Sequence, residues 1–142
     1  MPTRRVYLPV SRGALAALVS TGELGPAPLS AYAVTSVLGR PGLTVDEEEL
    51  EHAAWAAAAD AAVDLTDGGS HRRLVASADV DVATVLEGAA ADPASVTLGA
   101  AVPLRRIVSF HVEEHPGGRE LTDLLWYDVT ELPDVARIIN AD

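Results

Sequence analysis

The chain of 142 residues has no cysteine and no lysine, and its aromatic residues are two Trp, three Tyr and one Phe. Without cysteine, the chain cannot form disulfides, thiolate metal sites or a cysteine nucleophile. Without lysine, it can have neither a P-loop nor Schiff-base chemistry. No stretch approaches the ~20 apolar residues that a membrane-spanning helix needs. We expect no targeting segment, since Arg4 and Arg5 lead straight into a strand and then Pro9.

Positive charge is also scarce. Ten arginines stand against 21 acidic residues, which gives a net charge of −11. Nucleic-acid binders draw much of their affinity from Lys and Arg that neutralise phosphates, and an acidic protein repels such polyanions and anionic membrane surfaces. We therefore predict no nucleic-acid partner, no membrane partner and a cytoplasmic location.

Turn residues divide the chain into alternating strands and helices. Ser11 can cap a helix that Gly22 ends. A capping box of Thr44 and Glu47 can begin a second, alanine-rich helix. Asp81 can cap a short helix that runs to Glu87. A C-terminal helix with Pro133 in its first turn would follow. We expect strands over residues 5–9, 31–35, 73–80, 96–102, 107–114 and 124–127.

This order of elements predicts the fold class. Helices interleaved with strands favour an α+β fold, with α/β as the alternative. A chain of this length is expected to form a single globular domain over residues 1–142. We expect a single-domain sandwich, in which helices pack on a mixed β-sheet of about five to six strands.

Three arginine pairs, each preceding an apolar run, give the first candidate site. They are Arg4-Arg5, Arg72-Arg73 and Arg105-Arg106. Neighbouring side chains on a strand point to opposite faces, so one arginine of each pair can serve a common site, and Arg5, Arg73 and Arg106 are the set next to the apolar runs. Guanidinium groups bind carboxylate and phosphate bidentately, which predicts an anion site. The alternative is a set of surface ion pairs, and an antiparallel sheet would separate the pairs.

The segment after the last of these pairs gives a candidate metal site. On a strand, His111 and Glu113 share a face with their α-carbons ~6.7 Å apart. Both could then reach one metal ion, for which Asp79 or Asp81 is the expected third ligand. The alternative is a solvated strand end with an exposed histidine.

Aromatic residues near the C-terminus give a candidate pocket. Trp126 and Tyr127 could form its wall, and Asp128 could supply a polar contact at its edge. Core packing is the commoner role of aromatic residues, and alternation along a strand would leave one of the two facing outward. Trp55 lies beside the alanine stripe of the second helix and could contact another element or a partner subunit.

Several motifs resemble those of a family of uncharacterised actinobacterial proteins. They are Arg-Val-Tyr-Leu-Pro at 5–9, Gly-Glu-Leu-Gly-Pro-Ala-Pro-Leu at 22–29, Asp-Glu-Glu-Glu-Leu-Glu at 46–51, Leu-Trp-Tyr at 125–127 and Glu-Leu-Pro-Asp at 131–134. The resemblance spans nearly the whole chain. It implies a cytoplasmic bacterial protein and brings no activity with it.

The functional prediction is a binding or interaction module for a small anion or a protein partner, with a homodimer as the expected assembly and no cofactor. The chain has neither a Gly-x-Ser-x-Gly elbow nor a dinucleotide-binding glycine motif after the first strand. The alternative is a metal-dependent or carboxylate-based hydrolase that uses His111 and Glu113. A third interpretation is an interaction surface alone, built on an exposed apolar patch around Trp55 or Trp126.

Overall fold

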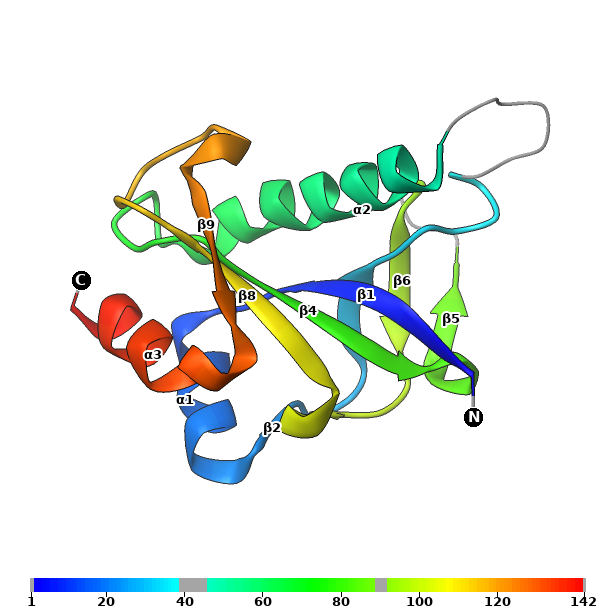
Figure 1. The fold of residues 1–142 in the computed structure, drawn as a ribbon, viewed down its shortest axis with the longest axis horizontal. Coiled ribbons are helices and arrows are strands. Elements are labelled where there is room, and N and C mark those ends of the chain that lie inside the picture. The colour runs from blue at the N-terminus through cyan, green and yellow to red at the C-terminus, as the bar shows by residue number, and fades with distance from the viewer. Residues whose placement is uncertain (1, 39–45, 89–91, 142) are drawn as a thin grey trace.

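A seven-stranded antiparallel sheet forms the centre of the computed structural model, which describes residues 2–38, 46–88 and 92–141 (Figure 1). The strand order is β5-β6-β3-β1-β4-β8-β9, and each neighbouring pair runs antiparallel. A separate two-stranded sheet pairs β2 with β7. The strands are β1 (Thr3–Pro9), β2 (Glu23–Leu24), β3 (Leu29–Tyr32), β4 (Leu74–Asp81), β5 (Val85–Glu87), β6 (Ser95–Leu98), β7 (Val102–Pro103), β8 (Ile107–Glu113) and β9 (Leu124–Asp128).

Within the described residues, three α-helices accompany the sheet. They are α1 (Arg12–Thr21), α2 (Glu47–Ala62) and α3 (Leu132–Asn140). Ser11 caps α1 by accepting a hydrogen bond from the backbone N–H of Ala14, and Gly22 ends the helix with a φ of 83°, as predicted. Asp46 caps α2, while the expected cap Thr44 lies outside the described residues. Short 3-10 helices cover Val63–Leu65, Val82–Thr84, Leu104–Arg106, Leu121–Asp123 and Val129–Glu131.

The predicted α+β class is confirmed, but the predicted sheet was too small and its mixed order was wrong. Asp81 caps only the 3-10 turn Val82–Thr84, and the residues after it form β5 instead of continuing as a helix. The run expected as one strand over 96–102 divides into β6 and β7, and β7 joins the second sheet. The result is not a clear sandwich, because the helices lie over parts of a wide antiparallel sheet.

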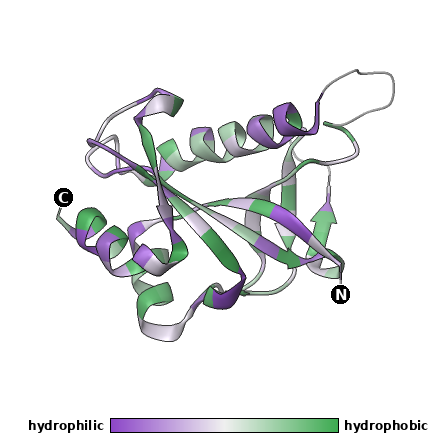
Figure 2. Ribbon diagram, viewed as in Figure 1, coloured by the Kyte–Doolittle hydropathy of each residue, from purple (hydrophilic) through white to green (hydrophobic). Residues whose placement is uncertain are grey.

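Two apolar cores lie on opposite faces of the large sheet. On one face, Val6, Leu8 and Phe110 pack with residues of α1 and α3. On the other face, Tyr7 and Val75 pack against the buried alanines of α2, which are Ala54, Ala58, Ala59 and Ala62. Small side chains let α2 approach the strands closely. Figure 2 shows hydrophobic residues along the central strands and hydrophilic residues at the first turn of α2, where Glu47, Glu48 and Glu49 lie.

The helices of the described residues are too short and too polar to cross a membrane. Their buried apolar residues pack in the two cores, and α2 begins with three glutamates.

Candidate functional site

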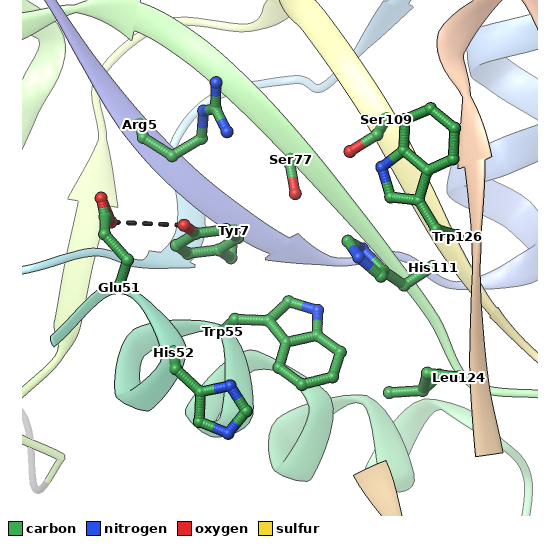
Figure 3. A pocket seen from close by; sticks show the side chains of 10 residues that line it. All are labelled: Arg5, Tyr7, Glu51, His52, Trp55, Ser77, Ser109, His111, Leu124 and Trp126. Atoms are coloured by element: carbon green, nitrogen blue, oxygen red, sulfur yellow. Dashed lines mark hydrogen bonds between the residues drawn. The ribbon is translucent and has the colours of Figure 1, made fainter. Parts of the chain in front are cut away.

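A cavity of about 500 Å³ lies between α2 and the face of the sheet formed by β1, β4, β8 and β9 (Figure 3). We call this cavity the α2 cleft. Its lining residues are Arg5, Tyr7, Glu51, His52, Trp55, Ser77, Ser109, His111, Leu124 and Trp126. Both its size and its combination of aromatic and polar side chains are typical of small-molecule sites.

Strand register places the sheet residues of the α2 cleft side by side. Tyr7 is opposite Ser77, Ser77 is opposite Ser109, and His111 is opposite Trp126. Alternate residues of a strand share a face, so β1, β8 and β9 each present a second residue two positions away, such as Arg5 beside Tyr7. Four strands therefore contribute polar and aromatic side chains to one surface.

Helix α2 forms the opposite wall. Glu51 and Trp55 are four residues apart and therefore lie on the same side of the helix, with His52 next to them. The ring of Trp55 lies between two imidazoles, with its centroid 5.4 Å from that of His52 and 5.1 Å from that of His111. Figure 3 shows Trp55 extending from the helix toward His111 on β8. The indole thus links the helix to the sheet.

Charged groups in the α2 cleft are already paired within the chain. The Nε atom of Arg5 donates to Oδ1 of Asp79 at 2.7 Å, and its Nη2 donates to Oδ2 at 3.2 Å. This bidentate bond raises the pKa of Arg5. The hydroxyl of Tyr7 donates to Oε1 of Glu51 at 3.3 Å. Burial raises the pKa of Glu51 and, together with the nearby Glu51 charge, raises the pKa of Tyr7 to about 12.

Two buried polar atoms in the walls of the α2 cleft lack a hydrogen-bond partner among the described residues. They are Nε1 of Trp55 and Nδ1 of His111. Burial lowers the pKa of His111, which favours the neutral imidazole. Buried polar groups in folded proteins are nearly always hydrogen-bonded, so each such atom calls for a partner that the chain does not provide.

The three arginines of the predicted anion site do not come together. Antiparallel order places Arg5 and Arg106 near one end of the central strands, since Arg5 is opposite Asp79 on β4 and Ala78 is opposite Ile107 on β8. Arg73 lies at the other end of β4, next to Glu113. Arg5 and Arg73 each have a carboxylate partner, which is Asp79 for Arg5 and Glu113 for Arg73. The residues that could grip a shared anion are therefore separated by the length of a strand.

The residues of the predicted metal site are separated in the same way. Asp79 is bonded to Arg5 at one end of the sheet, and Glu113 is bonded to Arg73 at the other. The carboxylate of Glu113 accepts from the backbone N–H of Arg73 at 2.8 Å and is only 1% exposed. Over residues 2–38, 46–88 and 92–141, no group of three or more His, Asp or Glu is arranged to hold a metal ion.

The three residues of the predicted aromatic pocket have different positions. Trp126 lines the α2 cleft and is 60% exposed. Tyr127 points to the other face, where it packs against the core that contains Phe110. Asp128 caps the 3-10 helix Val129–Glu131, accepting from the backbone N–H and the hydroxyl of Thr130, and these bonds lower its pKa.

Most residues of the α2 cleft did not stand out in the sequence. These residues are Tyr7, Glu51, His52, Ser77, Ser109 and Leu124. One usable indication was present, because Ser77 stands between Ala76 and Ala78 and Ser109 between Val108 and Phe110. Ser77 is 2% exposed and Ser109 is 3% exposed in the structure. Buried polar residues of this kind are uncommon in strands and can indicate a binding site on that face of the sheet.

Comparisons with known proteins identify the family but no activity. The model of a family described as "Family of unknown function (DUF6912)" matches residues 4–120. No curated protein and no solved structure matches the chain. The match covers β1 to the loop after β8, so it includes every strand of the α2 cleft except β9. The chain belongs to the DUF6912 family of unknown function.

Proposed function

We propose that the protein is a binding module for a small molecule and that the α2 cleft is its binding site. The observation that carries the proposal is the pair of buried, unpartnered polar atoms in the cleft walls, Nε1 of Trp55 and Nδ1 of His111. The cleft adds two serine hydroxyls and a largely exposed tryptophan, Trp126. Convergent polar groups among aromatic walls are the usual composition of a ligand pocket.

The α2 cleft supports an uncharged ligand better than the anion expected from the arginines. The guanidinium of Arg5 is engaged by both oxygens of Asp79. Glu51 adds a carboxylate to the cleft, and the protein carries a net charge of −11. An incoming anion would meet repulsion from these groups without a free cation to offset it.

The contacts of Glu113 and His111 do not favour the hydrolase alternative. Glu113 binds the backbone and the side chain of Arg73, so its carboxylate is not directed into the α2 cleft. His111 does line the cleft, but no described hydrogen bond joins it to an acid that would orient it as a general base. We therefore give the binding module priority.

A fragment screen by ligand-observed NMR tests the binding proposal. We expect hits with the native protein that weaken at least ~10-fold with Trp126→Ala, because this side chain forms the exposed wall of the cleft. Leu86→Ala is the matched control, since Leu86 on β5 is 58% exposed and lies at the opposite edge of the sheet. Hits that weaken equally with both variants would contradict the proposal.

We also propose that the protein is cytoplasmic and forms a homodimer. The edge strand β9 is the observation that supports the homodimer. This strand ends the large sheet, and its residue Leu125, which does not line the α2 cleft, is 41% exposed. Two antiparallel copies of an edge strand can pair about a two-fold axis, which gives a second copy of the chain a complementary surface. Light scattering at micromolar concentration should give twice the monomer mass, and Leu125→Glu should halve it. A monomeric mass for the native protein would remove this part of the proposal.

A further inference from the structure

We propose that the ligand of the α2 cleft is an uncharged, planar nitrogen heterocycle that carries carbonyl or ring-nitrogen acceptors. The inference rests on the proposed function, because it assigns a ligand class to the same cleft. Three properties of the lining residues lead to it: the shape of the walls, the balance of donors and acceptors, and the charge.

Flat rings form much of the lining. Trp126 on β9 is directly across from His111 on β8, and the ring of Trp55 approaches His111 from α2 with the two centroids 5.1 Å apart. Trp126 is 60% exposed, so much of its side chain is accessible to a ligand. Aromatic faces stack best on other planar π-systems. A planar ring fits this environment better than a branched aliphatic group.

The polar groups of the α2 cleft include three donors, on Trp55, Ser77 and Ser109. The indole Nε1–H of Trp55 can only donate, and it has no partner among the described residues. The hydroxyls of Ser77 and Ser109 can each donate one hydrogen bond and can also accept. Oε1 of Glu51 accepts from Tyr7, and both oxygens of Asp79 accept from Arg5. A ligand that carries acceptors therefore complements the donors of the cleft.

The neutral His111 adds an adaptable contact. Burial lowers its pKa, and a neutral imidazole has one nitrogen that donates and one that accepts. Its Nδ1 can therefore meet either a ring N–H or a ring acceptor of the ligand. Nε1 of Trp55 and Nδ1 of His111 both lie behind the surface of the cavity wall. Binding therefore includes a side-chain rotation of Trp55 or His111, which is a common adjustment at binding sites.

The two tryptophans make this inference directly observable. A ¹H–¹⁵N spectrum of the labelled protein has two indole N–H signals, one from Trp55 and one from Trp126. Trp55→Phe removes one of these signals, which assigns both. The variant also keeps an aromatic ring at position 55 while deleting the indole N–H donor. The probes are caffeine, nicotinamide, nicotinate and glucose. Nicotinamide and nicotinate share one ring and differ in charge, and glucose supplies donors without a planar ring.

We expect caffeine and nicotinamide to move the Trp55 indole signal in a saturable way. Nicotinate should bind at least ~10-fold more weakly than nicotinamide, because it brings a negative charge next to Glu51. Trp55→Phe should weaken caffeine binding at least ~5-fold through the loss of one hydrogen bond. Glucose should not move the signal.

The outcomes separate the ligand class from the binding site. If glucose or nicotinate moves the Trp55 signal more strongly than caffeine and nicotinamide do, the heterocycle is the wrong class while the α2 cleft remains a site. If no probe and no fragment hit moves either indole signal, the cleft itself is not the binding site and both proposals fail.

Discussion

Nη2 of Arg73 lies 3.3 Å from Oε2 of Glu113, and the two side chains are only 2% and 1% exposed. Glu113 also accepts from the backbone N–H of Arg73, and Nη2 of Arg73 donates to the carbonyl of Glu120. The pair joins the start of β4 to the end of β8 and to the segment that follows. Both residues were candidates for ligand binding in the sequence, but their contacts give them a structural role.

Removing one partner of this buried pair should be costly. We expect Arg73→Met to lower the free energy of unfolding by ~3–5 kcal/mol, because the Glu113 carboxylate would stay buried without its counter-charge. Urea denaturation measures the change. Arg137→Met is the matched control, since Arg137 pairs with Asp134 on the surface and is 73% exposed, and it should cost less than ~1 kcal/mol. Similar losses in the two variants would contradict the role assigned to the buried pair.

Gly118 should resist substitution because of the same carboxylate. A Cβ at this position would clash with Oε2 of Glu113 and would lie 2.7 Å from Oδ2 of Asp123. We expect Gly118→Ala to destabilise the fold by ~1–3 kcal/mol through the shift this contact forces. Gly13→Ala is the control, because Gly13 lies in α1 with nothing within 4 Å of an added Cβ. It should raise stability by ~0.5–1 kcal/mol through helix propensity. Thermal unfolding measures the midpoint of each variant. Equal shifts in the two variants would contradict the predicted clash at Gly118.

His111 should make the fold sensitive to mild acid. Burial lowers the pKa of His111 in the folded state below its value of 6.5 in the unfolded state. The unfolded chain therefore binds more protons between these two values, and the stability that is present above pH 6.5 is lost as the pH falls through the folded pKa. We expect His111→Gln to flatten this part of the stability curve, measured by urea denaturation from pH 7.5 to pH 5. The exposed His115 provides the control variant His115→Gln, which should keep the native slope. A native slope in His111→Gln would refute this assignment.

Glu51 should act in the opposite direction. Burial raises its folded-state pKa above the unfolded value of 4.5, so the folded chain binds more protons between the two values. Stability from this group is present below pH 4.5 and is lost as the pH rises through the folded pKa. Glu51→Gln keeps an oxygen that can accept from Tyr7 and removes the charge. The variant should therefore gain stability relative to the native protein as the pH rises from 4.5 to 7, in the same denaturation series. A constant difference across this range would be inconsistent with the burial of the carboxylate.

Local features of the fold could be predicted from the sequence, whereas the α2 cleft could not. Ser11 and Gly22 bound α1 as predicted, because capping depends on nearby backbone groups. Strand order depends on contacts between distant segments, and periodicity does not report it. For this reason, the anion site predicted from the arginine pairs required parallel strands, which the sequence could not establish. The antiparallel register instead aligned Tyr7, Ser77 and Ser109, none of which is distinctive by itself.

Amide chemical-shift mapping of the fragment hits shows where on the protein they bind, and so tests whether the α2 cleft is the binding site. We predict that the largest shifts fall on residues 51–55, 109–111 and 124–126, the segments that contribute to the cleft. The comparison is a second cavity of about 280 Å³ on the chain, which is lined largely by apolar residues that include Leu24, Pro28 and Leu29. Shifts concentrated around residues 24–30, with the α2 cleft unchanged, would contradict the claim that the α2 cleft is the binding site.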